Sequence, residues 1–441
     1  MTVGEIGALL RTRKVSCTDF IQQTFTDVKD RDRFRSFITL SEEQALAEGA
    51  ECDRELASGL DRGPLHGVPI AHKDLFYTRG VRTTAGSLVY REFVPNHDAA
   101  IVQRLKDAGA VSIGKTNLHE LAYGITSKNP HYGFVLNPRD TTRIAGGSSG
   151  GSAAAIAAGF LPLTTGTDTG GSIRIPASFC GIVGFKPTYD LVSRRGVLPL
   201  AFSLDHVGPM ASCVSDCALA MNAMADGEFH LPPLRDFKGI RVGAPANFYF
   251  ERVQSEVAAA VHNAISEMER LGASVAEVRV PDPAEINATA RIVQLAEVAA
   301  LYAKYQDSNL FGEDVWALLE QGRMIAGHEY VNAQRLRTLF RREFNRLWKQ
   351  IDVLVTPTTP TPAPQLEERN VQIGSEHEDA RMASTRLVRG INLLGEPALS
   401  MPCGASGEGL PIGIQLISAP FTDARLLQMA TLLEESLRVT F

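Results

Sequence analysis

Two glycine-rich turns, each leading into an apolar segment, constrain the fold of this chain most strongly. The first, residues 145–152, runs directly into the apolar residues 153–159, and the second, residues 166–176, follows soon after. A flexible linker would not lead into an apolar helix and then a buried strand. Glycines in apolar surroundings indicate backbone that is held close to another group. We therefore expect both turns to be ordered and to carry chemistry.

Strands and helices alternate on the C-terminal side of these turns. Residues 240–243 are typical of a strand, residues 257–271 of an amphipathic helix and residues 274–280 of the next strand. Such alternation predicts an α/β fold with a mixed, mostly parallel central sheet covered by helices on both faces. We expect a single large domain over residues 1–441, made of N-terminal helices (1–59), a core that holds the motifs (63–211), and the remaining sheet and helices (212–441).

The segments near the two ends extend this prediction. Ser16 or Thr18 can cap a helix in the N-terminal part. The proline-rich residues 356–364 are expected to form an ordered surface crossing and not a domain linker, because strand-like pieces follow them. The elements expected after residue 283 are a helical tract (283–349), a strand (352–355), two further strands (397–402 and 412–417) and a closing helix (423–437).

The charges and the apolar stretches exclude several classes of partner. Lys plus Arg number 44 against 50 Asp plus Glu, so the net charge of -6 gives no basic field for a nucleic-acid backbone. The apolar residues 153–163 contain Gly159 and Pro162 and fall short of the ~20 residues of a membrane-spanning helix. Glu5 stands where a signal peptide needs basic residues. We expect a cytoplasmic protein without nucleic-acid or membrane contacts.

The cysteines indicate neither a disulfide framework nor a metal site. Six cysteines in 441 residues are too few for a disulfide scaffold, which favours a reducing compartment. Cys213 and Cys217 would share a helix face, but no matching cluster of His or Cys completes a zinc site. We therefore expect no structural metal.

Residues 109–116 match the phosphate-loop pattern G-x-x-x-x-G-K-T letter for letter. A phosphate loop runs from a strand through the glycine-rich loop into a helix. Here a helix over residues 100–108 is expected to end at Gly109, and residues 111–113 are expected to form a strand. We therefore do not expect nucleotide binding.

Ser149 lies at the centre of a G-x-S-x-G pattern, which is typical of a nucleophile elbow. That mechanism needs an acid and then a histidine further along the chain. Among the downstream histidines, only His206 has a distinctive setting, in Ser-Leu-Asp-His. A Ser-His-Asp hydrolase is therefore the second mechanism to consider.

A serine in the second turn has a better setting for nucleophilic catalysis. Ser172 ends a run whose backbone N–H groups can converge on an oxyanion: those of Thr169, Gly170, Gly171 and Ser172. Its hydroxyl needs a base, and no histidine is near either turn in the sequence. Lys73 follows an apolar strand, where burial would lower its pKa from ~10.4 towards neutrality. The alternative for Lys73 is a solvated position at a strand end.

Together these segments resemble the amidase signature family. The resemblance rests on Gly-Gly-Ser148-Ser149-Gly-Gly-Ser, then Gly-Thr-Asp-Thr-Gly-Gly-Ser172-Ile-Arg-Ile-Pro-Ala, with Val-Pro-Ile-Ala-His-Lys73-Asp upstream. It covers nearly the whole chain and is densest over residues 63–211. The resemblance implies the fold of that family.

The resemblance also implies a Ser-cisSer-Lys triad. In it Ser172 is the acylated nucleophile, Ser148 is the bridging serine after a cis peptide bond from Gly147, and Lys73 is the base. The same resemblance makes residues 109–116 a helix–strand corner and implies that Ser149 is not the nucleophile.

The implied activity is hydrolysis of the C–N bond of a linear, non-peptide carboxamide. An acyl-enzyme forms on Ser172, and no metal or organic cofactor is required. The expected partner is a small-molecule amide, and a homodimer is compatible with this interpretation. By resemblance Tyr123, Gly124 and Ile125 are candidates for the wall of the substrate pocket, with ordinary packing as the alternative.

Two other interpretations remain open. The chain also resembles the glutaminase subunit of a tRNA-dependent amidotransferase, which passes ammonia to partner subunits, and Arg337 occupies a position like that of an arginine that binds the glutamine carboxylate. A non-enzymatic protein with the same fold is disfavoured, because all three triad positions are intact. The sequence does not identify the acyl group, since loops such as residues 307–321 and 364–380 shape the pocket.

Overall fold

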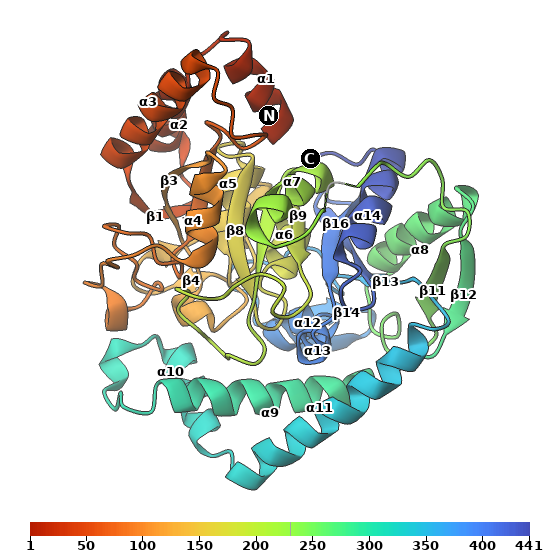
Figure 1. The fold of residues 1–441 in the computed structure, drawn as a ribbon. Helices are drawn as coiled ribbons and strands as arrows, with labels where there is room; N and C mark the ends of the chain where they lie inside the picture. The colour runs from red at the N-terminus through yellow and green to blue at the C-terminus, as the bar shows by residue number, and fades with distance from the viewer. Residues whose placement is uncertain (230) are drawn as a thin grey trace.

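A continuous 11-stranded sheet forms the centre of the molecule (Figure 1). The computed structural model describes residues 1–229 and 231–441. In spatial order the strands are β1 (Phe37–Leu40), β3 (Val111–Thr116), β2 (Pro69–Lys73), β8 (Leu163–Asp168), β10 (His206–Ala211), β9 (Val183–Lys186), β16 (Ala398–Ala405), β17 (Pro411–Ile417), β13 (Val353–Pro357), β11 (Arg241–Pro245) and β12 (Ser274–Val278). Three two-stranded sheets pair β4 (Lys128–Asn129) with β5 (Gly133–Phe134), β6 (Leu136–Asn137) with β7 (Asp140–Ile144), and β14 (Asn370–Ile373) with β15 (Glu376–Asp379).

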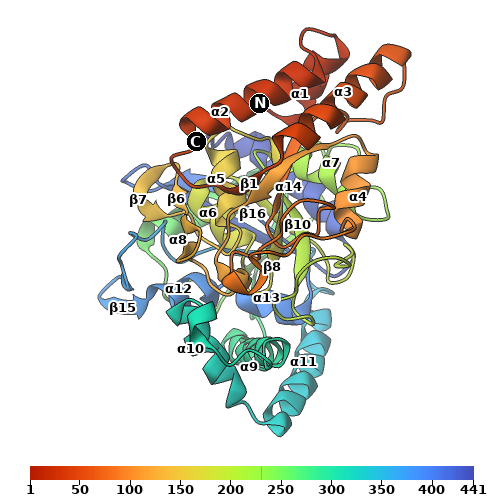
Figure 2. The same cartoon turned by 90° about the vertical axis from the view of Figure 1, so that its left-hand side faces the viewer.

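Helices flank this sheet, so the predicted mixed α/β fold is confirmed. The α-helices are α1 (Val3–Arg11), α2 (Cys17–Arg31), α3 (Glu42–Ser58), α4 (Ala100–Asp107), α5 (Gly150–Ala157), α6 (Arg174–Cys180), α7 (Val214–Met224), α8 (Ser255–Arg270), α9 (Pro283–Leu301), α10 (Glu313–Arg323), α11 (Gly327–Leu347), α12 (Ala380–Arg386), α13 (Arg389–Leu394) and α14 (Asp423–Leu437). Short 3-10 helices are η1 (Leu88–Tyr90), η2 (Glu120–Ala122) and η3 (Ser308–Leu310). Figure 2 shows α1–α3 at one end of the molecule and α9–α11 at the other.

The sheet contains less parallel pairing than the sequence predicts. β3, β2 and β8 pair in parallel near one edge, as do β13, β11 and β12 at the other. From β8 through β10, β9, β16 and β17 to β13 every pairing is antiparallel. β8, α6 and β9 also alternate as strand, helix and strand, but β10 lies between β8 and β9 and pairs antiparallel with both. β16 and β17 follow each other through a short turn, which also gives antiparallel pairing. The sheet is therefore mixed, and "mostly parallel" is corrected.

Two buried apolar clusters pack against the sheet. One joins α1, α2, α7, α8 and α14 to the central strands. The other packs α9, α10, α11 and α13 against β13 and β17. One sheet shared by both clusters supports the expected single domain, which stays a prediction.

Several local expectations are confirmed. Ser16 caps α2 by accepting a hydrogen bond from Asp19 N at 3.0 Å, and α14 has the expected bounds. The tract 283–349 forms α9, α10 and α11 with short breaks. Residues 356–364 are ordered but buried, which corrects the surface position expected for them.

The phosphate-loop match has a different structure from a nucleotide site. Gly109 follows α4 with φ +86°, and the Gly-Lys-Thr end of the pattern lies inside β3. Lys115 is buried and donates to the hydroxyls of Thr78 (3.2 Å) and Thr83 (3.0 Å). The expected helix–strand corner is confirmed. None of the helices over residues 1–229 and 231–441 combines the length and apolar character needed to cross a membrane.

Candidate active site

The carboxyl ends of β2 and β8 bring four polar side chains together. These strands pair in parallel, so both end at the same edge of the sheet, which is where functional groups gather in α/β folds. Lys73 is the last residue of β2, and Thr167 is the penultimate residue of β8. α5 begins at the same edge, with Ser149 at its N-cap and Ser148 just before it. All four side chains are buried.

Three hydroxyl groups surround the amine of Lys73. Its Nζ lies 2.7 Å from Ser148 Oγ, 2.8 Å from Thr167 Oγ1 and 3.0 Å from Ser149 Oγ. A hydroxyl can both accept and donate a hydrogen bond, so this cage accommodates an ammonium and also a neutral amine. Thr167 was not predicted from the sequence, although its place beside Asp168 in the glycine-rich turn was an available signal.

Burial holds the pKa of Lys73 far below its ordinary value. Removal of the ammonium from water lowers the pKa from 10.5 to about 7, although the charges of Asp168 and Asp205 oppose this shift. The expected direction of the shift is confirmed, and Lys73 is not a solvated residue.

Ser148 and Ser172 lie on two turns that contact each other. The peptide bond from Gly147 to Ser148 is cis, as the resemblance implies. Ser149 N donates to Ser172 O at 3.2 Å, which joins the two turns. Within residues 1–229 and 231–441, no hydrogen bond links the hydroxyls of Ser148 and Ser172. Such contacts often tighten only when substrate binds.

The loop between β8 and α6 is held in shape by Asp168. Its carboxylate accepts hydrogen bonds from Ile173 N (3.1 Å) and from Arg174 Nε and Nη2 (3.0 and 2.9 Å). Burial alone would raise the pKa of Asp168, but the buried guanidinium of Arg174 holds it well below its usual range. This ion pair fixes the backbone that carries Ser172.

The expected oxyanion site differs at Gly171. Its N–H donates to Asp168 Oδ1 at 2.7 Å, so this donor is not free for an oxyanion. The N–H groups of Thr169, Gly170 and Ser172 carry no hydrogen bond to another described residue. These three donors remain candidates.

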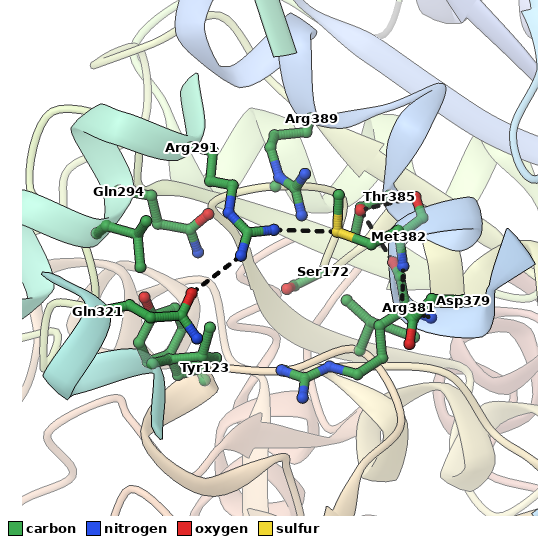
Figure 3. A pocket seen from close by; sticks show the side chains of 16 residues that line it. Tyr123, Ser172, Arg291, Gln294, Gln321, Asp379, Arg381, Met382, Thr385 and Arg389 are labelled. Carbon is green, nitrogen blue, oxygen red and sulfur yellow. Dashed lines mark hydrogen bonds between the residues drawn. The ribbon is translucent and has the colours of Figure 1, made fainter. Parts of the chain in front are cut away.

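A cavity of about 420 Å³ opens beside Ser172 (Figure 3). Tyr123, Gly124 and Ile125 line it, as the resemblance implies. Gly170 lines it too, so the loop that carries the three candidate oxyanion donors faces the same cavity. Gln321 and Asp379 also line it, within the segments 307–321 and 364–380 that were expected to shape the pocket. Five further polar residues of the lining carry no local motif and were not predicted: Arg291, Gln294, Arg381, Thr385 and Arg389.

Three residues considered from the sequence lie in other settings. Ser149 Oγ donates to Thr167 O at 3.2 Å and does not line the cavity. His206 is buried, with Nδ1 2.7 Å from Leu204 O, and burial lowers its pKa well below the ordinary value. Arg337 binds Leu393 O and Ser203, away from the cavity, so its expected position near a substrate carboxylate is corrected.

One cluster outside the cavity has the composition of a metal site. Cys52, Glu55 and His66 offer ligand atoms within 4.8 Å of one another. However, His66 Nδ1 accepts the Arg62 N–H at 3.0 Å, and the guanidinium of Arg62 pairs with Glu55. The carboxylate of this cluster therefore already has a cationic partner.

A sequence model of the family described as Amidase matches residues 23–427. The chain belongs to the amidase family. Amidase-family enzymes are C–N hydrolases, and the resemblance given by the motifs is confirmed.

Curated members of the amidase family align along their whole length with this chain. The glutamyl-tRNA(Gln) amidotransferase subunit from Azoarcus sp. (strain BH72) is 38% identical, covering 97% of this chain and 96% of the relative. The subunit of the same name from Moorella thermoacetica is also 38% identical, covering 99% and 96%.

Solved amidase-family structures share the complete fold. A chain from a vestigial protein complex that reveals the evolutionary origins of an s-triazine catabolic enzyme has a TM-score of 0.94 at 34% identity, covering 100% of this chain and 99% of that one. A crystal structure of an amidase has a TM-score of 0.93 at 35% identity, covering 99% of both chains.

Proposed function

We propose that this amidase-family chain hydrolyses carboxamides through an acyl-enzyme on Ser172. The observation that carries the proposal is the buried Lys73 amine, held by three hydroxyls and with its pKa near 7. A base near neutral pKa can accept a proton at physiological pH. The Ser172 hydroxyl beside a cavity supplies the nucleophile.

The reaction follows from this arrangement. Neutral Lys73 takes the proton of Ser148, which takes the proton of Ser172 as its Oγ attacks the carbonyl carbon. The N–H groups of Thr169, Gly170 and Ser172 stabilise the oxyanion. The C–N bond then breaks, the leaving nitrogen receives the proton through Ser148, and the acyl group stays on Ser172. Water attacks this ester through the same relay and regenerates the serine.

The relatives suggest two settings for this chemistry: a subunit of an amidotransferase complex, or a hydrolase that acts by itself. The curated relatives, which are named as amidotransferase subunits, support a chain that releases ammonia from glutamine for partner subunits. The solved amidase supports the second candidate, a hydrolase that acts by itself on a small amide. The first setting has the better support from the curated relatives.

The deciding experiment measures ammonia release by the purified chain from primary amides, aryl amides, ureido compounds and glutamine. Amide turnover with an acyl group trapped on Ser172, seen by mass spectrometry, is the expected result. Glutamine turnover only after partner subunits are added supports the amidotransferase setting. If no amide is hydrolysed under either condition, the proposed function is wrong.

A further inference from the structure

The wall of the cavity that faces Ser172 carries an excess of positive charge. Three guanidinium groups line it, from Arg291, Arg381 and Arg389, against one carboxylate, that of Asp379 (Figure 3). Asp379 is engaged at the start of α12, where its side chain accepts the N–H groups of Arg381 and Met382 at 3.1 and 2.9 Å. The cavity therefore holds cations that its own acidic residue does not balance.

Two of the three arginines have no carboxylate partner among the described residues. Arg291 donates to Gln321 Oε1 at 3.1 Å and contacts Met382 Sδ at 3.0 Å, both of them neutral groups. Arg389 Nε is buried without a hydrogen-bond partner. Arg381 lies 3.9 Å from Asp314. A charged group whose buried N–H has no hydrogen-bond partner is costly unless a ligand supplies one, and this applies to Arg389 Nε.

Arg389 lies close to the backbone that carries the nucleophile. A Cβ placed on Gly170 would lie 3.6 Å from Arg389 Cγ and 3.8 Å from its Nε. The Tyr123 hydroxyl in the same wall is also buried and without a partner. An anionic group bound by Arg389 would thus sit a few bonds from the carbonyl that Ser172 attacks.

We propose that the substrate is a primary amide whose acyl part bears a carboxylate bound by Arg389 and Arg291, with no cationic group beside it. The nitrogen of a primary amide leaves as ammonia and carries no other group, so the cavity can distinguish such substrates only by their acyl part. The cavity offers a partner for an anion, whereas its one carboxylate, Asp379, is occupied. This inference rests on the proposed amide hydrolysis. It favours the hydrolase that acts by itself over the release of ammonia from glutamine, because glutamine carries an ammonium beside its carboxylate.

The test compares amides that differ in charge. Wild-type chain is assayed for ammonia release from butyramide (neutral), from glutaramate and succinamate (the mono-amides of glutarate and succinate, anionic) and from glutamine (zwitterionic). Because a hydrogen-bonded charge pair strengthens binding substantially, we expect kcat/KM of the better anionic amide to exceed that of butyramide about 10- to 100-fold. Glutamine is expected to be weaker than that anionic amide.

Substitution of Arg389 tests the residue itself. Arg389→Gln should lower the ratio of kcat/KM for the anionic amide over butyramide about 10- to 100-fold, mainly through KM, and Arg389→Lys should restore part of it. Arg425→Gln is the matched control, because Arg425 is exposed on α14 and does not line the cavity. Equal losses on charged and neutral amides in Arg389→Gln would overturn the proposal, as would butyramide or glutamine matching the anionic amides in the wild type.

A binding measurement separates this inference from the proposed function. Calorimetric titration of glutaramate and succinamate into Ser172→Ala needs no turnover. Binding of either compound that is lost in the Ser172→Ala/Arg389→Gln double variant supports the anion site even if hydrolysis fails. No binding, or binding unchanged by the second substitution, overturns it. Hydrolysis of neutral amides without any preference for an anion leaves the proposed function intact and removes only the anion site.

Discussion

At the scale of single residues, the two neighbouring serines Ser148 and Ser149 and the distant Ser172 have different environments. Ser172→Ala is expected to lower kcat on the order of 10⁴-fold or more, because the nucleophile is removed from a backbone-built site. Ser149→Ala removes one of three hydroxyls around Lys73 and should cost about 10-fold. Ammonia release by both variants, with circular dichroism as the folding control, checks this. A larger loss in Ser149→Ala would reopen the G-x-S-x-G mechanism.

The pH dependence of catalysis should follow the charge of Lys73. The ammonium form cannot accept a proton, so kcat/KM should rise about tenfold per pH unit below pH 7 and level off above it. Lys73→Arg keeps the charge but cannot deprotonate, so it should be as inactive as Lys73→Ala across the pH range. Substantial activity in the arginine variant would show that Lys73 has only a structural role.

The residues around the nucleophile differ in how far the sequence predicts them. Lys73, Ser148 and Ser172 lie in short motifs, so their catalytic roles can be predicted from the neighbouring residues in the sequence. Arg389 carries no motif, and its position depends on how α13 packs near β8. Arg337 is the opposite case, in which the sequence suggests a binding role that the structure does not support. It resembles an arginine that binds a substrate carboxylate, but its guanidinium donates to backbone carbonyl groups of the fold.

At the scale of elements, the first turn of α5 depends on a glycine with no room for a side chain. A Cβ on Gly151 would lie 2.5 Å from both Asn117 N and Ser36 O, which are backbone atoms and cannot move alone. Gly151→Ala should therefore lower the free energy of unfolding by about 1–3 kcal/mol. Urea unfolding checks this.

Gly159→Ala is the matched control for that substitution, since nothing lies within 4 Å of its added Cβ and only its φ of +76° is strained. Activity should fall more in Gly151→Ala than in Gly159→Ala, because α5 carries Ser148 and Ser149 at its start. Equal stability and activity in the two variants would contradict the close approach at Gly151.

Helix and strand existence could be predicted, whereas pairing direction could not. Periodicity identifies α8, α14 and the strands β16 and β17 from local sequence. The direction in which β8, β10 and β9 pair depends on connections between segments that lie far apart, and no local pattern encodes it. The burial of the proline-rich residues 356–364 could not be predicted either, because it depends on which distant parts of the chain pack against them.

At the scale of the whole molecule, the continuous sheet predicts cooperative unfolding. If the chain is one domain, circular dichroism and tryptophan fluorescence should give the same urea midpoint. Trp316 lies in α10, and Trp348 is the residue that ends α11. Fluorescence therefore reports the surroundings of these two helices, and dichroism reports the whole chain. An earlier fluorescence transition would show that α9–α11 form a separate unit.

The proposed chemistry and the proposed substrate recognition reside in different halves of the chain. Lys73, Ser148 and Ser172 precede residue 180, whereas Arg291 and Arg389 come from α9 and α13. Substitutions in the later helices can therefore change which acyl group is accepted while the hydroxyl cage stays intact. In evolutionary terms, such a chain can come to accept a new substrate through substitutions in one wall of its cavity, while its catalytic residues stay unchanged.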